Sequence, residues 1–220
     1  MDDSGQVKPL VVVGAGGFGR EVASLIHDIN VICPEWQFMG FLDDGVDGST
    51  VEGYPILGPV SSINTLPTPI YVVCAVGDPR LRRKLVARIE TYGCEFATLI
   101  HPTVSKSQHV SIGEGSIICA GTILTTNIKI GKHSILNLNC KVGHDSILGD
   151  YTSCMPGVNI AGEVVVGDGS YFGLNACVIN RVNIGKWSII GAGAAAVKDI
   201  PSRCVAVGVP AKPIKTLGDG

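Results

Sequence analysis

The adjacent residues His144 and Asp145 are the pair in this chain best suited to acid–base chemistry. Imidazole groups have an unperturbed pKa of about 6.5, so a histidine can accept a proton at neutral pH. A neighbouring carboxylate can fix the histidine tautomer and stabilise the imidazolium. The alternative interpretation is an exposed ion pair without a catalytic role. Four further histidines are interpreted as ordinary surface or corner residues: His27, His101, His109 and His133.

A six-residue repeat runs through the segment that contains this pair. Such a period fits neither an α-helix nor an alternating strand, and it is typical of a parallel β-helix in which each hexad forms one short strand and one corner. Glycine often follows the apolar residue, where it permits a tight corner, and a small or β-branched residue lies four positions after it. The fifteen positions expected to point into the core are Ile112, Ile118, Leu124, Ile130, Leu136, Val142, Leu148, Cys154, Ile160, Val166, Phe172, Val178, Ile184, Ile190 and Ala196.

The N-terminal part of the chain follows a different pattern, of strand, glycine turn and helix. Residues 8–13 read as a buried strand, and an amphipathic helix is predicted to follow the turn. Such a turn directs backbone N–H groups and a helix N-terminus at a phosphate. A second predicted strand, residues 36–42, ends in Asp43 and Asp44, at the spacing where a dinucleotide fold holds a ribose. The turn itself reads Gly14-Ala15-Gly16-Gly17-Phe18-Gly19.

Taken literally, this pattern predicts an NAD site, but the length of the unit favours a different interpretation. Predicted strands at 70–75 and 96–99 and a basic helix at 79–92 complete only about half of a full dinucleotide fold. A single mononucleotide-binding half therefore fits better. The basic side chains of the last helix are interpreted as a solvated face: Arg80, Arg82, Arg83, Lys84 and Arg88.

The two patterns predict two domains, an α/β domain at residues 1–99 and a β-helix at residues 100–220. Ile100 already lies in the hexad register, and Lys106 breaks that register once before Ile112. The predicted fold class is thus a small parallel α/β sheet, a Rossmann-like half, followed by a parallel β-helix of hexapeptide repeats.

Composition excludes several classes of function. The formal net charge of −2 gives no indication of nucleic-acid binding, because nucleic acid is itself negatively charged. No apolar run is long enough to cross a bilayer. Met1 to Ser4 lack the basic start of a signal peptide. The eight cysteines form no CxxC pair, and Cys140 and Cys154 fall on expected core positions. Reduced, buried cysteines in a cytoplasmic protein are therefore expected.

Together these segments resemble the nucleotide-sugar acetyltransferases of the left-handed β-helix superfamily. The closest likeness is to bacterial enzymes of the bacillosamine pathway that N-acetylate a UDP-linked 4-amino-4,6-dideoxy sugar, and sialic-acid O-acetyltransferase-like proteins belong to the same group. The likeness covers nearly the whole chain. It rests on residues 14–22, Phe41-Leu42-Asp43-Asp44, Ile100-His101-Pro102, Gly143-His144-Asp145, Ala161-Gly162 and Gly208-Val209-Pro210-Ala211-Lys212.

The resemblance implies a homotrimer that uses acetyl-CoA, bound between adjacent β-helices, as co-substrate and needs no metal. It implies that His144 is the general base, that Asp145 orients it, and that the Gly162 N–H faces the thioester carbonyl. The N-terminal domain would hold the nucleotide rather than NAD. The implied substrate-binding residues are Gly14, Gly16, Gly17, Phe18, Gly19, Arg20, Asp43, Asp44, Gly77 and Asn137, and the implied coenzyme contacts are Ser153, Gly162, Leu174, Gly191 and Ala192.

One departure and several alternatives accompany this resemblance. Relatives can carry a second histidine nine residues after the base, where this chain has Ser153. The acceptor could instead be a sialic-acid hydroxyl or a GDP-linked amino sugar. A γ-type carbonic anhydrase would need three histidines on zinc, for which only His109, His133 and His144 are candidates. A non-catalytic protein that binds nucleotide sugars would share the fold without the chemistry.

Overall fold

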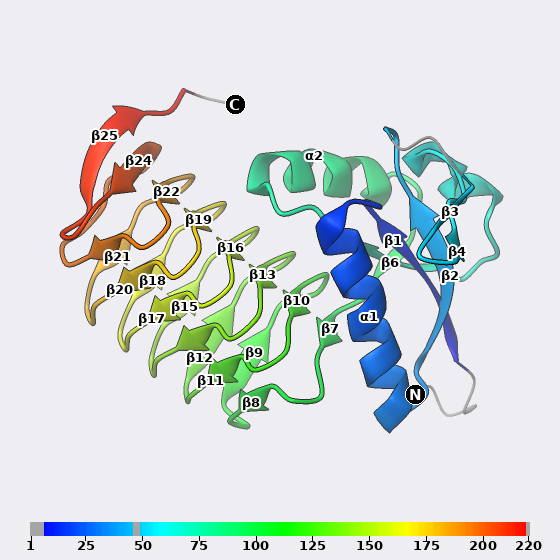
Figure 1. Ribbon diagram of the computed structural model, residues 1–220, viewed down its shortest axis with the longest axis horizontal. Coiled ribbons are helices and arrows are strands. Elements are labelled where there is room, and N and C mark those ends of the chain that lie inside the picture. Colours follow the sequence, from blue (N-terminus) through cyan, green and yellow to red (C-terminus); the bar gives the residue numbers. More distant parts are fainter. Residues whose placement is uncertain (1–6, 46–48, 219–220) are drawn as a thin grey trace. The chain divides into compact units, whose positions relative to one another are not determined.

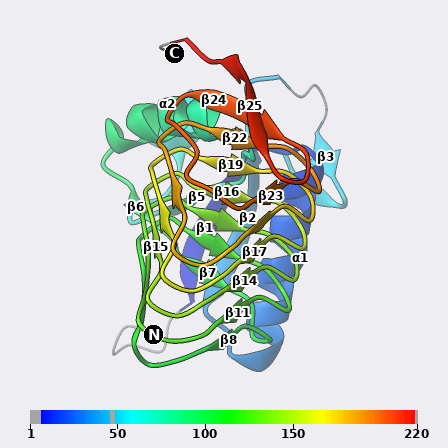
Figure 2. The same cartoon turned by 90° about the vertical axis from the view of Figure 1, so that its left-hand side faces the viewer.

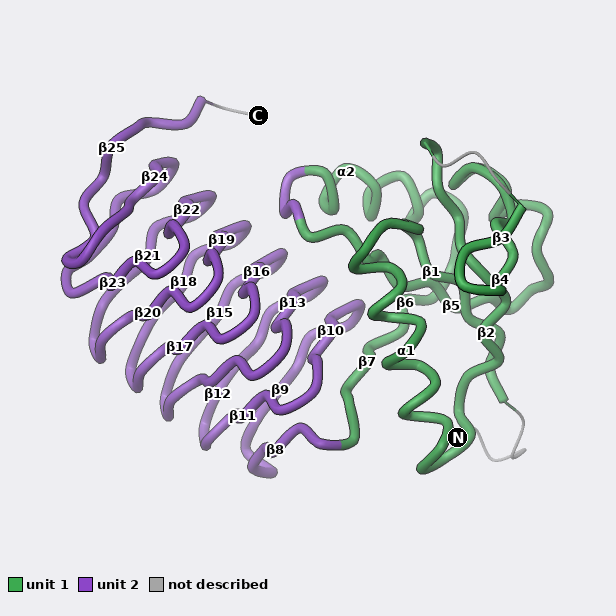
Figure 3. The backbone as a smooth tube through the Cα atoms, in the orientation of Figure 1, with its two compact units in different colours: residues 1–77, 81–102 green, residues 78–80, 103–220 purple. Residues whose placement is uncertain are grey.

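The computed structural model describes residues 7–45 and 49–218 of the chain. Met1 to Ser4, on which the signal-peptide prediction rests, lie outside the described residues. Two compact units are present, residues 1–77 with 81–102 and residues 78–80 with 103–220 (Figure 3). The sequence predicts a domain boundary between residues 99 and 100, and this division of the structure into units falls between residues 102 and 103. The predicted domain boundary stays a prediction.

The first unit is built on a four-stranded sheet in which all neighbouring strands are parallel (Figure 1). The strand order is β2-β1-β5-β6. Two helices, α1 and α2, follow β1 and β5, as in a βαβ unit. The elements are β1 (Lys8–Val13), α1 (Gly17–Ile32), β2 (Trp36–Leu42), β5 (Tyr71–Cys74), α2 (Pro79–Glu90) and β6 (Glu95–Phe96).

The core of this unit confirms the predicted amphipathic helix. Helix α1 contacts β1 and β2 and buries the side chains of Val22, Leu25, Ile26 and Ile29. The sequence pattern did not reveal a small insertion between β2 and β5, because its strands are only two residues long. That insertion consists of β3 (Thr50–Val51), β4 (Tyr54–Pro55) and the 3-10 helix η1 (Val60–Thr65).

Arg82 corrects the prediction of a fully solvated basic face on α2. Its side chain is completely buried, and its guanidinium donates to the carbonyl oxygens of Val76 (2.6 Å) and Gly77 (3.2 Å). These carbonyls belong to the turn that links β5 to α2, where backbone acceptors need donors. Arg82 therefore closes this turn instead of facing water.

The second unit is a parallel β-helix, which confirms the predicted fold class. Up to residue 196, successive coils repeat every eighteen residues with three short strands each, so that Ile118 pairs with Leu136 and Leu136 with Cys154 (Figure 2). The last turn is shorter, since Ile190 pairs with Ala206. One face holds β10 (Ile117–Ile118), β13 (Ile135–Leu136), β16 (Ser153–Cys154), β19 (Tyr171–Phe172) and β22 (Ile189–Ile190).

The other two faces repeat the same arrangement. The second face holds β8 (Ser105–Lys106), β11 (Ile123–Leu124), β14 (Lys141–Val142), β17 (Asn159–Ile160), β20 (Cys177–Val178) and β23 (Ala195–Ala196). The third holds β9 (Val110–Ile112), β12 (Ile128–Ile130), β15 (Ile147–Leu148), β18 (Val165–Val166) and β21 (Asn183–Ile184). A short strand β7 (Leu99–Ile100) precedes the coils, and an antiparallel pair, β24 (Cys204–Val207) and β25 (Lys212–Thr216), follows them.

The interior of the β-helix follows the six-residue register. Of the fifteen predicted core positions, all except the partly exposed Ile112 are buried, with at most 3% of the side chain exposed. Small residues four positions later have a physical role, because the buried hydroxyls of Ser116, Ser134 and Ser146 each donate to a backbone carbonyl of the next coil. Cys140 and Cys154 are buried as predicted, and neither forms a disulfide.

Candidate active site

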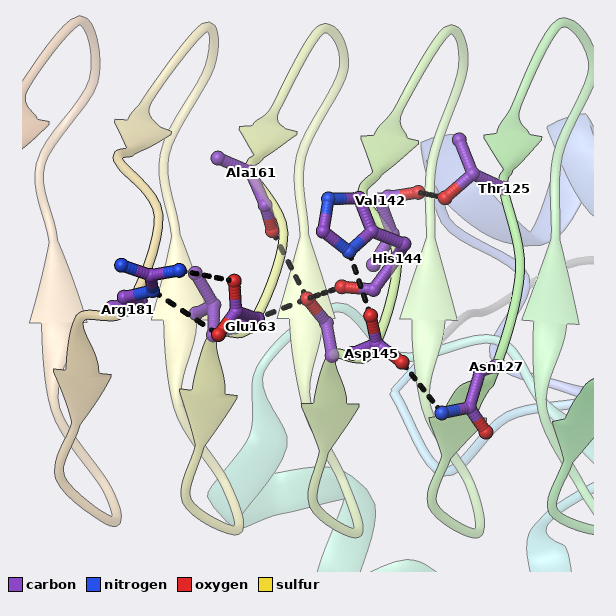
Figure 4. Close-up of polar contacts among 10 residues, drawn as sticks. Thr125, Asn127, Val142, His144, Asp145, Ala161, Glu163 and Arg181 are labelled. Atoms are coloured by element: carbon purple, nitrogen blue, oxygen red, sulfur yellow. Dashed lines mark hydrogen bonds and ion pairs between the residues drawn. The ribbon is translucent and has the colours of Figure 1, made fainter.

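His144 lies at the corner between β14 and β15 (Figure 4). Because equivalent residues of successive coils are eighteen positions apart, Gly162 and Asn180 occupy the position of His144 in the next two coils. We call the column of equivalent corners at residues 125–128, 143–146, 161–164 and 179–182 the histidine edge. The His144 side chain is 56% exposed, so a ligand can reach its imidazole.

Two hydrogen bonds hold the carboxylate beside this imidazole. Nδ1 of His144 lies 2.7 Å from Oδ2 of Asp145, and Nδ2 of Asn127 donates to Oδ1 of Asp145 at 2.6 Å (Figure 4). The hydrogen bond from Asn127 and then that from His144 hold the pKa of Asp145 below its ordinary value. An ionised carboxylate only accepts hydrogen bonds, so the proton is assigned to Nδ1 of His144 and Nε2 keeps its lone pair.

Gly162 lies directly over the imidazole ring. A Cβ atom at this position would stand 2.6 Å from Nε2 and 2.7 Å from Cε1 of His144. Within the described residues, the Gly162 N–H donates no hydrogen bond, whereas the next amide, that of Glu163, donates to the His144 carbonyl. The ring therefore packs against the backbone of Gly162, a buried residue whose N–H has no acceptor among the described residues.

A shallow groove of ≈ 450 Å³ runs along the second face beside the histidine edge. Its lining is largely apolar and includes the residues that precede His144 and Gly162 in the chain, Gly143 and Ala161. An apolar groove with a few polar groups at its rim is the usual form of a small-molecule site. The groove lining comprises Ile123, Thr125, Lys141, Val142, Gly143, Asn159, Ile160, Ala161, Cys177, Val178, Ile179 and Asn180.

Three polar residues of the histidine edge were missed by the sequence analysis. Asn127 is one of them, and the other two are Arg181 and Glu163, which form two 3.1 Å hydrogen bonds (Figure 4). Residues 127, 145, 163 and 181 are spaced by eighteen positions and all have positive φ angles, between 53° and 64°. An eighteen-residue period, read at corner positions rather than core positions, was the signal that could have found them.

The residues predicted to contact coenzyme lie elsewhere on the coil. Gly191, Ala192 and Leu174 follow the first-face strands β22 and β19, at the corner before the second face. Asn137 lies in the same column as Gly191 and is buried, with its Oδ1 accepting the Leu138 N–H at 2.7 Å. Ser153 lies on β16 and is buried. Their predicted roles in binding stay predictions.

The glycine turn of the first unit has the geometry expected of a phosphate-binding loop. Gly14 has φ +102°, a conformation that L-residues rarely adopt, and a Cβ at Gly19 would collide with the Gly14 carbonyl oxygen. Gly16 precedes α1 as its N-cap and Gly17 begins the helix, and a Cβ at Gly16 would meet nothing within 4 Å. Phe18 is partly buried in the first turn of α1. The open volume beside Gly16 lies at the N-terminus of α1, and the free N–H groups at a helix N-terminus favour an anion.

The predicted acids bind backbone amides around this turn. Asp43 accepts the N–H of Ala15 through Oδ2 and that of Gly45 through Oδ1, both at 2.8 Å. Asp44 accepts the Val60 N–H at 2.8 Å and pairs with Arg88 at 2.6 Å. The Val60 amide and then Arg88 hold the pKa of Asp44 below its ordinary value. In the structure, Asp43 therefore connects the end of β2 to the glycine turn, and Asp44 connects it to the start of η1.

A small cavity of ≈ 190 Å³ lies at the carboxyl ends of β1 and β2. Ligands of open α/β sheets bind at this edge. Two other predicted residues lie outside its lining: Arg20 pairs with Glu52 at 3.5 Å, and Gly77 accepts from Arg82. The cavity is lined by Val13, Gly14, Leu42, Asp43, Asp44, Val60, Val76, Leu81 and Leu85.

No group of three or more histidine, cysteine, aspartate or glutamate side chains among the described residues is arranged to hold a metal ion. His133 lies at a different corner of the coil from His109 and His144. No helix in residues 7–45 and 49–218 has the length and apolarity needed to cross a membrane.

Comparison with known proteins places this architecture among acyltransferases. Residues 9–89 match the family model of the PglD N-terminal domain. The chain is 31% identical over 183 residues to GDP-perosamine N-acetyltransferase of Escherichia coli O157:H7, covering 83% of this chain and 82% of the relative.

Solved structures give the same result over nearly the whole chain. The acetyltransferase domain of PglB from Neisseria gonorrhoeae in complex with acetyl coenzyme A superposes with a TM-score of 0.88 at 31% identity, over 95% of this chain and 100% of that one. PerB from Caulobacter crescentus, in complex with CoA and GDP-perosamine, superposes with a TM-score of 0.83 at 31% identity, over 96% and 99% of the two chains.

An α/β unit that precedes a hexapeptide-repeat β-helix with an exposed histidine on its edge defines a two-domain acetyltransferase. The chain belongs to the PglD-like family of hexapeptide-repeat β-helix acetyltransferases. It is an acetyl-CoA-dependent enzyme.

Proposed function

We propose that the enzyme transfers the acetyl group of acetyl-CoA to the 4-amino group of a UDP-linked 4-amino-4,6-dideoxy sugar, with His144 as the general base. The observation that carries this proposal is the exposed His144, held by Asp145 through Nδ1 at 2.7 Å, beside an apolar groove. A base presented in this way has its free Nε2 available to an incoming amine. The relatives that act on, or are bound to, perosamine nucleotides support an amino-sugar acceptor.

The chemistry requires removal of one proton from the attacking amine. The amine nitrogen forms a bond to the thioester carbonyl carbon, and Nε2 of His144 takes the proton that the nitrogen loses. The tetrahedral intermediate then collapses with cleavage of the carbon–sulfur bond, and the CoA thiolate receives the proton from the imidazolium. Asp145 keeps its negative charge throughout and stabilises the imidazolium, so no covalent acyl-enzyme is needed.

Charge that develops on the carbonyl oxygen needs a donor. The Gly162 N–H, which donates to no described residue, is the proposed donor. Its residue lies against the imidazole, which supports a donor and a base acting on the same ligand. A single donor of this kind contributes on the order of 10²–10³ to kcat. The thioester arm would lie in the groove. The other proposed coenzyme contacts lie outside the lining of this groove and are Leu174, Gly191, Ala192 and Ser153.

The acceptor nucleotide is assigned to the first unit. The glycine turn, the N-terminus of α1 and the cavity bounded by Asp43 and Asp44 support a diphosphate and nucleoside there. Asn137 is the proposed contact to the sugar. Assembly into homotrimers and a cytoplasmic location are part of the same proposal.

A GDP-linked amino sugar is the second candidate acceptor. It is favoured by the E. coli relative, a GDP-perosamine N-acetyltransferase, which is 31% identical over 83% of this chain. The two candidates share the β-helix chemistry and differ in the base bound near the ≈ 190 Å³ cavity.

A panel assay tests the proposal. CoA thiol release from acetyl-CoA would be measured with UDP- and GDP-linked 4-amino sugars and with sialic acid. Rapid turnover of a UDP-4-amino sugar is the expected outcome. Preferred turnover of a GDP sugar would move the acceptor to the second candidate, and turnover of sialic acid alone would contradict N-acetylation. Nucleotide-sugar binding without thiol release from any of them would leave a binding protein.

A further inference from the structure

Asn127 belongs to the first corner of the histidine edge, residues 125–128. Asn127 lies one coil before Asp145, at φ +53°, and its side chain is exposed. The backbone of these two corners is already joined, because the Asp145 N–H donates to the Thr126 carbonyl at 3.1 Å. The amide of Asn127 therefore does not hold the coils together alone, and its hydrogen bond to Asp145 needs another explanation.

The geometry points to Asn127 as a positioning residue for the proposed reaction: its amide fixes the Asp145 carboxylate so that Oδ2 meets Nδ1 of His144 and Nε2 faces the ligand. This inference rests on the proposed role of His144. The chain of contacts runs from Asn127 Nδ2 to Asp145 Oδ1 (2.6 Å) and from Asp145 Oδ2 to His144 Nδ1 (2.7 Å) (Figure 4). Each carboxylate oxygen thus has its own donor.

A carboxylate on this exposed corner would not stay in one orientation without a second anchor. The terminal torsion of an aspartate is broad and roughly two-fold, so a single hydrogen bond to an exposed ring leaves it free to turn. Asp145 and His144 are both about half exposed, so packing does little to restrain them. An uncharged amide is suited to this anchoring because it donates at every pH and adds no charge that would compete for the imidazole.

The left-handed backbone offers a competing explanation for asparagine at this position. Asparagine tolerates positive φ better than most residues, and Asn175 has the same conformation, φ +55°, at another corner. Asn127→Gly separates the two explanations, since glycine accepts this backbone freely but removes the amide. Asn175→Gly is the matched control for stability, because it makes the same exchange away from His144.

The first measurement compares steady-state kinetics. Asn127→Gly is expected to lower kcat on the order of tenfold and leave the KM for acetyl-CoA unchanged, with a melting temperature no lower than that of Asn175→Gly. Asn127→Asp, which keeps the shape but replaces the donor with a second carboxylate, is expected to lose at least as much. In an Asp145→Asn background, Asn127→Gly should cost less than twofold, because Asn127 acts through Asp145.

The second measurement needs no acceptor. Long-range ¹H–¹⁵N spectra of the imidazole nitrogens, assigned with His144→Gln, are expected to show the Nδ1–H tautomer in the wild-type chain and a mixture of tautomers in Asn127→Gly. An unchanged tautomer together with kcat within twofold of wild type would overturn the inference. If His144→Ala proved fully active, the general-base proposal would fail, whereas the spectra would still test the role of Asn127.

Discussion

At the scale of single residues, the chemistry of the site depends on how His144 is held. Its Nδ1 lies 2.7 Å from Oδ2 of Asp145, its Nε2 lies next to Gly162, and the side chain as a whole is 56% exposed. The Asp145 carboxylate is charged at neutral pH, and its lowered pKa keeps it charged into more acid solution, where its protonation would remove the partner of the imidazole. The ring is therefore fixed by neighbours at a corner that is otherwise open.

Replacement of His144 tests the base directly. His144→Ala is expected to lower kcat about 10²–10⁴-fold, because it removes the proton acceptor, with little change in the KM for acetyl-CoA. Steady-state kinetics with varied acetyl-CoA would measure both constants. His27→Ala, at an exposed histidine of α1, is the matched control. Activity of His144→Ala within threefold of wild type would contradict the role.

At the scale of elements, the spacing of the coils decides what each corner can hold. Two glycines of the histidine edge illustrate this because they meet different neighbours. A Cβ at Gly143 would lie 2.5 Å from the backbone nitrogen of Gly162, whereas a Cβ at Gly162 would meet the half-exposed His144 ring. Backbone atoms inside a stack of coils cannot move aside, but an exposed side chain can.

These neighbours predict opposite phenotypes for two alanine substitutions. Gly143→Ala is expected to destabilise the fold by about 1–3 kcal/mol, as overpacking does. Gly162→Ala is expected to keep the melting temperature near that of wild type and to lower kcat at least tenfold, because it displaces the imidazole. Thermal unfolding and steady-state kinetics on both variants would check this. A Gly162→Ala enzyme with wild-type kcat would show that the position of the His144 imidazole does not depend on glycine at residue 162.

At the scale of the whole molecule, apolar side chains on the outside of the β-helix support the proposed association. Ile147 and Val165 lie side by side on adjacent coils of the third face, each 44% exposed, and Ile123 on the second face is 40% exposed. Strand residues that alternate with core positions are expected to be polar when they face water. Apolar residues there favour contact with another chain.

The predicted assembly is a homotrimer. Analytical ultracentrifugation is expected to give a mass three times the 22.9 kDa of the chain. The double variant Ile147→Glu/Val165→Glu should shift this mass toward the monomer and reduce acetyl transfer, because the proposed coenzyme site lies between β-helices. A wild-type monomer with full activity would contradict both expectations.

The sequence alone determined the fold class and the position of the candidate base. The six-residue period predicted the β-helix because every inward position must be apolar in a stack with a single narrow core, and fourteen of the fifteen predicted positions are buried to at least 97%. His144 and Asp145 could be recognised because they are adjacent in the chain.

Only the tertiary structure decided the partners that come from other coils. Asn127 and Gly162 lie eighteen residues to either side of the His144–Asp145 pair, and their contacts arise from the stacking of corners, which a period read at core positions does not specify. The sequence predicts a solvated Arg82 because charged side chains are seldom buried, but in the fold the turn after β5 supplies carbonyl acceptors that compensate for its burial. Such contacts join residues that are far apart in the sequence, and the local sequence pattern does not specify which of these residues meet in the fold.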